Sequence, residues 1–115
     1  MPVVEKGCTG VAMVQRQVVL IEASRTHTVH DRYLEVFTYI PFGHRTFLAT
    51  EVPLARIPPM DVLTIFPSSD VMRKPEKGML EIPPKAFAEF LELNAMAQKK
   101  YERLYNAWAA AGIST

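Results

Sequence analysis

The sequence predicts an α+β fold, in which five or six mostly antiparallel strands form a twisted sheet or partly open barrel against one long C-terminal helix. Two observations predict it. Over residues 1–82, segments rich in β-branched and aromatic residues alternate with proline and glycine turns. Over residues 84–111, apolar residues instead recur every three or four positions, as on an amphipathic helix. A chain of this size builds one core, so we expect residues 1–115 to form a single domain.

Two segments in the first half have the composition of strands. Residues 11–22 (VAMVQRQVVLIE) are rich in β-branched residues and form one long strand or a tight hairpin. Residues 33–40 (YLEVFTYI) form the clearest strand, and alternation places Leu34 and Phe37 on opposite faces. If the face with Leu34 meets the helix, Tyr33, Phe37 and Tyr39 lie on the opposite face. The polar residues 23–31 between the two segments are expected to be a loop.

Prolines divide the following part of the chain into short segments. Residues 41–45 (PFGHR) predict a turn, after which residues 46–52 return as the antiparallel partner of the preceding strand. Residues 53–59 contain three prolines, which cannot donate to a sheet, and therefore form an irregular crossover or an edge segment. The remaining elements expected before the helix are short: a strand at 61–66, a charged loop at 72–78 and a strand at 79–82.

The C-terminal segment has the signals of a helix at both ends. Pro83 or Pro84 suits the first turn, and Gly112 suits the position after the last. A helix from Pro84 to Ala111 would be roughly 42 Å long, whereas a domain of this size is only about 26 Å across. The helix must therefore bend or break near Asn94, or project and pack on something else.

Composition excludes several classes of protein. Thirteen Lys and Arg against twelve Asp and Glu leave a net charge of +1, which disfavours a strongly basic nucleic-acid binder. Cys8 is the only cysteine, so neither an intrachain disulfide nor a thiolate zinc cluster is possible. No secretory signal is recognisable, and no apolar run approaches the ~20 residues that span a bilayer. We expect a cytoplasmic protein without a membrane partner.

The densest group of polar residues consists of His27, His30 and Asp31. Imidazole and carboxylate groups can bind a transition metal, with His44 or Asp61 as a further ligand. A three-residue spacing outside a helix fixes no coordination geometry, so a solvated loop is the favoured interpretation. We therefore expect no metal and no cofactor.

Signatures of catalysis are missing from the sequence. There is no glycine-rich phosphate loop, no nucleophile elbow and no H-E-x-x-H motif. No base can be placed beside Cys8, and no carboxylate can be assigned to orient His44. The sequence therefore favours a non-enzymatic module, with a small enzyme or metal site that uses His27, His30 and His44 as an alternative.

The aromatic strand offers another alternative function. Rings on one face of this strand could stack on unpaired bases while neighbouring cations bind phosphates, as in single-stranded nucleic-acid binders. Packing or an oligomer contact is the favoured explanation, because such binders usually have a positively charged groove. The residues of this candidate surface are Arg32, Tyr33, Phe37, Tyr39, His44 and Arg45.

The last turns of the predicted helix carry the strongest indication of a partner. Tyr101, Leu104, Tyr105 and Trp108 place much ring surface at one end of a small domain, where tyrosine and tryptophan favour contacts that are apolar on one side and wet on the other. These rings either close the end of the protein's own sheet or form a homodimer contact. We expect a small interaction module that self-associates through these four residues.

Overall fold

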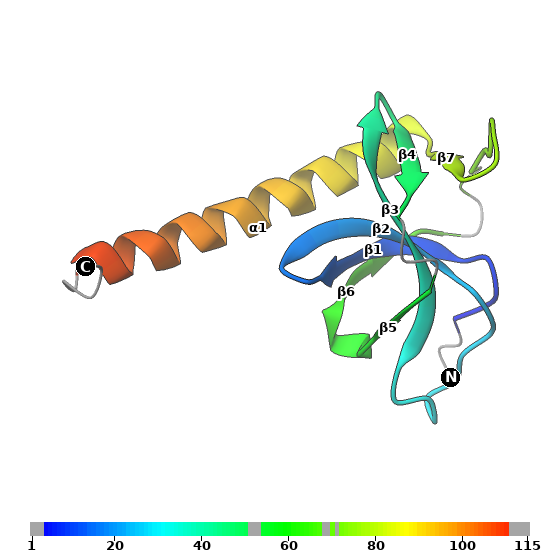
Figure 1. Cartoon of the computed structure of the whole chain (residues 1–115), viewed down its shortest axis with the longest axis horizontal. Coiled ribbons are helices and arrows are strands. Elements are labelled where there is room, and N and C mark those ends of the chain that lie inside the picture. Colours follow the sequence, from blue (N-terminus) through cyan, green and yellow to red (C-terminus); the bar gives the residue numbers. More distant parts are fainter. Residues whose placement is uncertain (1–3, 51–53, 68–69, 71, 111–115) are drawn as a thin grey trace.

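A computed structural model describes residues 4–50, 54–67, 70 and 72–110 of the chain. It consists of one antiparallel sheet, which is not closed, and one long C-terminal helix (Figure 1), so the predicted α+β fold is confirmed. The strand order is β6-β1-β2-β3-β4-β7, and β5 pairs with β3 beside this path. The elements are β1 (Thr9–Val14), β2 (Gln17–Ala23), β3 (Leu34–Gly43), β4 (Thr46–Ala49), β5 (Ala55–Ile57), the 3-10 turn η1 (Pro59–Asp61), β6 (Val62–Ile65), β7 (Met79–Glu81) and α1 (Pro84–Ala110).

Residues 11–22 form the tight hairpin that was one of the two predicted possibilities. Val14 pairs with Gln17, so only Gln15 and Arg16 make the turn. Their φ angles are 50° and 66°, which suits the two-residue turns that match the twist of a hairpin. Such angles are uncommon for residues other than glycine. The turn therefore holds the long side chain of Arg16 at the tip of the hairpin.

The sheet is curled, so that its central strands are buried on both faces. Alternate residues of β1 and β2 enter two different hydrophobic clusters. The helix-side core contains Val11 and Leu20 together with Phe47 and with Phe90 of α1. The second core contains no helix residue, and it consists of Ala12, Val19, Ile21, Leu34, Val36 and Ile57. Burial on both faces explains why residues 11–22 show no clear alternation of polar and apolar residues.

The helix covers the face of β3 that is opposite to Leu34. Tyr39 belongs to the helix-side core, whereas Leu34 packs in the second core with Ile57 of β5. The condition that the face with Leu34 meets the helix is therefore not met. The topology decides at which end of β3 the helix starts: α1 follows β7, which pairs with β4 at the far end of β3 from Leu34.

The short strands fall within their predicted segments. The predicted turn at 41–45 is shorter than expected, because residues 41–43 continue β3 and pair with β4, so that only His44 and Arg45 make the turn. The return strand is β4, of which residues 46–49 are in strand conformation, while residues 51–53 lie outside the described part. Within the proline-rich segment 53–59, β5 pairs with residues 34–36 of β3. The six strands of the path match the predicted number, and β5 adds a seventh to the sheet.

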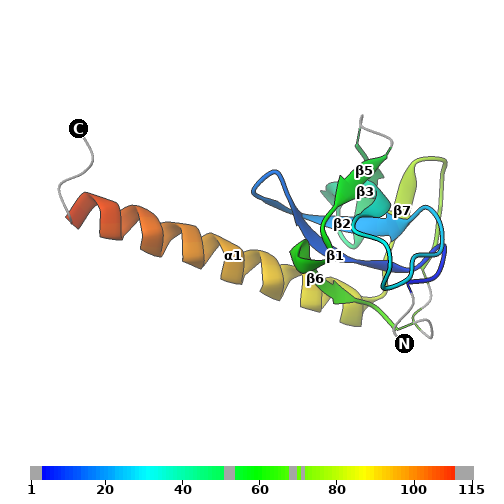
Figure 2. The same ribbon diagram turned by 90° about the horizontal axis from the view of Figure 1, so that it is seen from below.

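The helix begins at Pro84 and continues to Ala110 without a break at Asn94, so the projecting alternative is the correct one. Its inner half is anchored by Ala86 and Phe90, both buried, and the rings of Phe90 and Phe47 meet edge to face at 4.9 Å. From residue 98 to residue 109 every side chain that the structure describes is exposed. Figures 1 and 2 show this outer half extending well past the sheet. Gly112 lies outside the described residues.

None of the described helices is both long enough and apolar enough to cross a membrane. Although α1 has 27 residues, Lys, Arg and Glu side chains interrupt its apolar positions along the whole length.

Candidate functional site

The outer half of α1 carries large apolar side chains that the sheet does not cover. The exposed fractions are 51% for Leu104, 71% for Tyr105 and 63% for Trp108. The side chain of Tyr101 lies outside what the structure describes, although its backbone is helical. Of the two interpretations offered by the sequence, closure of the protein's own sheet is therefore wrong for the three described side chains. In the single chain they face solvent.

These exposed residues continue the face of the helix that packs on the sheet. Eleven residues make slightly more than three helical turns, so positions eleven apart lie on nearly the same side. Ala86, Leu93 and Ala97 contact the helix-side core, and the same offset leads from Leu93 to Leu104 and from Ala97 to Trp108. We call residues 97, 101, 104, 105 and 108 the outer stripe. The apolar face with which the inner half of α1 packs on the sheet thus continues beyond the edge of the sheet.

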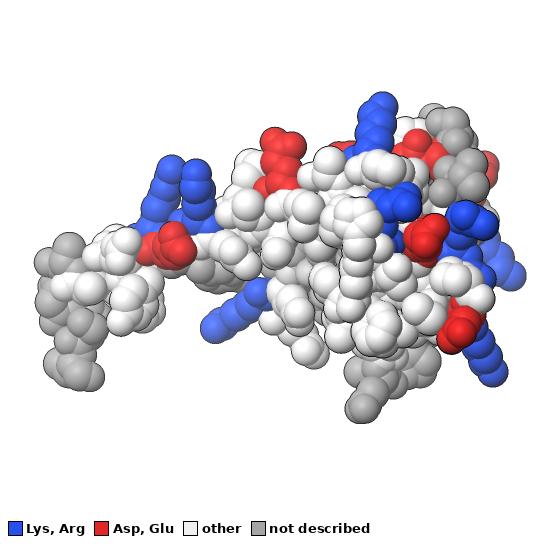
Figure 3. Space-filling view, turned by 90° about the horizontal axis from the view of Figure 1, so that it is seen from above, with Lys and Arg blue, Asp and Glu red and all other residues white. Residues whose placement is uncertain are grey.

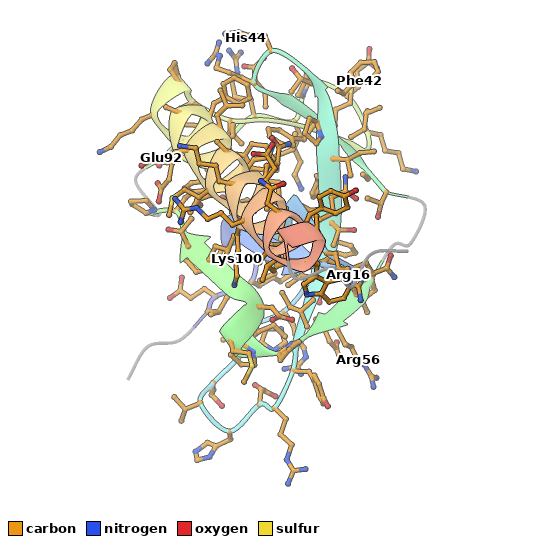
Figure 4. All side chains as sticks on the ribbon, turned by 90° about the vertical axis from the view of Figure 1, so that its left-hand side faces the viewer. Arg16, Phe42, His44, Arg56, Glu92 and Lys100 are labelled. Carbon is orange, nitrogen blue, oxygen red and sulfur yellow. The ribbon has the colours of Figure 1, made fainter. Side chains whose placement is uncertain are left out.

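A hollow lies where the outer stripe meets the sheet. Its volume is about 270 Å³, and it opens between the tip of the β1–β2 hairpin and the middle of α1. Figure 4, which looks along the helix from its outer end, shows Arg16 beside the helix. The apolar part of the lining consists of Val18, Pro41, Phe90 and Ala97, and the polar part consists of Arg16, Gln17, Asn94 and Gln98. We call it the junction hollow.

Of the charged residues of the outer half, Lys100 lies beside the outer stripe, four residues before Leu104 and lining the same pocket, whereas the others lie farther round the helix. At 100° per residue, Lys99, Glu102 and Arg103 point to the other side of the helix from Leu104 and Trp108. Figure 3 shows Lys and Arg side chains standing on this part of the helix. Among the described residues, none of these three takes part in an ion pair. A partner on the outer stripe would leave all three charges in water.

His27 is buried, although it lies in the segment that the sequence assigns to a solvated loop. Its side chain is 1% exposed, so that interpretation was wrong for this residue. The backbone of Val4 pairs with that of His27, with N–O distances of 3.1 and 2.8 Å, which draws His27 inward. The N–H of Glu35 donates to Nε2 of His27 at 3.1 Å, which assigns the ring proton to Nδ1, 3.7 Å from Oδ2 of Asp31.

Asp31 closes the same loop. The N–H of Thr28 donates to Oδ2 of Asp31 at 2.9 Å, and Arg25 donates to Oδ1 at 3.3 Å. The hydrogen bond from Thr28, and then that from Arg25, hold the pKa of Asp31 below its ordinary value of 3.8. A pocket of about 350 Å³ adjoins this loop, lined by Val4, His27, Thr28, Val29, Asp31, Leu34 and Pro59.

The three histidines are not brought together. His30 is exposed, and His44 lies at the tip of the β3–β4 hairpin (Figure 4), where its ring meets Phe87 at 5.4 Å. Figure 1 places the loop between β2 and β3 at the opposite end of the sheet from this tip. In the described ranges no three or more His, Cys, Asp or Glu side chains are grouped so that they could hold a metal ion.

The aromatic strand does not present its residues as one surface. Tyr39 is buried and donates a hydrogen bond to Oε1 of Glu22 at 3.2 Å, and burial raises the pKa of Tyr39 to about 12. Arg45 donates to the carbonyl oxygen of Ile82 at 3.4 Å. The other members are exposed but separated along β3: Arg32, Tyr33 and Phe37 lie toward its start, and His44 lies beyond its end.

Compared with known proteins, the chain matches no family model, no curated protein and no solved structure. The candidate site is therefore interpreted from its own geometry. The sequence pointed to the outer stripe but missed the junction hollow, whose lining comes from the β1–β2 hairpin, from β3 and from the helix. The one signal for it was the polar interruption at Gln15 and Arg16, which marks the hairpin tip.

Proposed function

We propose that the protein is a small non-enzymatic interaction module that self-associates through the outer stripe of α1. One observation carries the proposal: the apolar face of the helix continues for three turns beyond the sheet that covers its inner half. Exposed apolar patches on this scale usually mark an interface. Tyrosine and tryptophan are also the residues most enriched at interface centres, where they contribute most of the binding energy.

Burial of these exposed side chains favours a protein surface as the partner. Leu104, Tyr105 and Trp108 are each more than half exposed, and burial of apolar surface contributes about 25 cal/mol per Å². In a two-fold dimer each side chain acts twice, once from each copy. The charges of Lys99, Glu102 and Arg103 point to the other side of the helix, so association would not remove them from water.

The chain provides a matched pair of variants to test the proposal. Leu104 and Leu91 lie on the same helix and are 51% and 49% exposed, but only Leu104 lies on the outer stripe. We expect Leu104→Ser to weaken self-association by roughly 30-fold, since about 1 kcal/mol of apolar burial is lost from each copy. Leu91→Ser should leave it unchanged.

The measurement is molar mass by light scattering over a wide range of protein concentrations, combined with sedimentation equilibrium. Wild type should pass from monomer to dimer as concentration rises. A wild-type chain that remains monomeric at the highest concentration, or equal effects of the two leucine variants, would contradict the proposal.

The alternatives raised by the sequence lack a supporting arrangement. Binding of single-stranded nucleic acid would need the rings and cations of the aromatic strand on one surface. Instead, Tyr39 is buried, and the exposed members lie toward opposite ends of β3. For a small enzyme or metal site, His44 is at the other end of the sheet from His27 (Figure 1). We also propose a cytoplasmic location, because a free Cys8 suits a reducing compartment.

A further inference from the structure

The junction hollow is shaped for one large side chain. Its volume of about 270 Å³ lies below the roughly 300–1,000 Å³ that is usual for small-molecule sites. Apolar groups form much of its lining, and Arg16 and three amide side chains add hydrogen-bond donors at the same place. An aromatic ring with one polar group matches this combination, since the indole of tryptophan has a large apolar surface and a single N–H.

The tryptophan of the same chain cannot reach this hollow. Trp108 lies eleven residues beyond Ala97 on a continuous helix, about 16 Å farther along its axis. Trp108 is the only tryptophan in the sequence, and it is 63% exposed. A ring and a cavity that suit each other, but that are held apart by a rigid element, can meet only between two chains.

The length of the free stripe fixes how two copies can meet. The inner half of the helix face is covered by the sheet as far as Ala97, so a second helix can lie only on residues 97–108. In a parallel pair the two sheets, which pack on this same face, would compete for one space. In an antiparallel pair the free segments overlap fully when Trp108 of one copy lies over Ala97 of the other.

We infer that the junction hollow binds Trp108 of a second copy, in an antiparallel two-fold dimer with its axis between residues 102 and 103. This inference rests on the proposed function, and it specifies how the two helices are aligned in the dimer. Each dimer then contains two identical ring-in-hollow contacts, as two-fold symmetry requires. The small side chain of Ala97 leaves room for the ring, and Leu104 lies near the middle of the overlap.

Arg16 has a specific part in this contact. It lines the hollow from the hairpin tip, where its backbone is held at φ 66°. A guanidinium over the face of an indole is favourable by electrostatic attraction to the ring. Glycine would suit this backbone angle better than arginine. The arginine at this position therefore costs some turn stability, and it places a cation at the hollow.

The test uses Trp108 as its own reporter. In the wild-type chain, tryptophan emission should shift to shorter wavelength, and acrylamide quenching should fall, over the same concentrations at which light scattering records dimers. Trp108→Ala should weaken dimerisation by at least several hundred-fold, since a central tryptophan of an interface contributes about 2 kcal/mol or more and one is lost from each copy. Ala97→Leu fills the hollow and should weaken it similarly, while circular dichroism of the dilute protein checks that the helix is retained.

Mixing the two defective chains distinguishes binding in the second copy from a structural effect. The Trp108→Ala chain keeps an open hollow and contains no tryptophan, whereas the Ala97→Leu chain keeps its tryptophan and has a filled hollow. Added in excess, the first should shift the emission of the second to shorter wavelength, because one ring-in-hollow contact is restored. An Ala97→Leu, Trp108→Ala double variant, which offers no hollow, is the matched control and should cause no shift.

Arg16→Gly gives an independent variant that cannot fail by misfolding of the turn. It should keep or raise the melting temperature of the dilute protein and weaken dimerisation by at least about fivefold, as expected for loss of one cation–π contact of about 0.5 kcal/mol or more from each of the two hollows. If wild type forms dimers while its emission and quenching stay constant, the hollow is not the binding site, although the proposed function stands. If wild type remains monomeric, both fail.

Discussion

Replacement of Phe90 by alanine tests whether the inner half of α1 is anchored and the outer half is free. Phe90 is 1% exposed in the helix-side core, and its ring meets Phe47 edge to face at 4.9 Å. Loss of a buried phenylalanine side chain costs about 3–5 kcal/mol. Phe90 also lines the junction hollow, through which water can enter the vacated space, so we expect a value near the lower end, about 3 kcal/mol. That is a large part of the ~5–15 kcal/mol that stabilises a typical domain.

The assay is urea unfolding followed by circular dichroism, at protein concentrations where the chain is monomeric. Leu91→Ala is the control from the adjacent position, and since Leu91 is 49% exposed it should change the free energy of unfolding by no more than about 0.5 kcal/mol. Trp108→Ala should have an equally small effect on the monomer. A cost below about 1 kcal/mol for Phe90→Ala, or a cost for Trp108→Ala as large as that for Phe90→Ala, would refute the anchored-and-projecting helix.

Three further outcomes follow from single positions. Gly10→Ala should destabilise the monomer by about 1–3 kcal/mol in the same urea assay, because the new Cβ would collide with the carbonyl oxygen of Thr64 in the paired strand β6; an unchanged midpoint would contradict this packing. The pKa of Tyr39, raised to about 12, makes the folded state hold its proton longer than the unfolded state, so stability should be complete below about pH 10 and fall as pH rises toward 12. Absorbance at 295 nm should show a late-ionising phenol in wild type that is lost in Tyr39→Phe. Because the pKa of Asp31 is depressed, its stabilising effect should be present at neutral pH and disappear as pH falls below about 4, so the difference in melting temperature between wild type and Asp31→Asn should shrink in acid; a constant difference would exclude this role.

Most of the fold could be predicted because local patterns encode it. The hairpin at 11–22, the strand at 33–40 and the helix from Pro84 each follow from residues that are close in sequence. The face of β3 that meets the helix could not be predicted, because both faces of this strand carry apolar residues that are buried in one core or the other. The burial of His27 was likewise missed, since it results from pairing with Val4, more than twenty residues away.

By itself, the sequence determined the elements and the amphipathic stripe of the helix, since periodicity and proline placement act over a few residues. It also determined that rings gather at the helix end. Only the tertiary structure decided that the sheet stops near Ala97, that Leu104 and Trp108 extend past it, and that Arg16 comes to lie beside the helix. These features depend on how far the curled sheet reaches along a rigid rod, and that distance is set by packing between segments far apart in the chain.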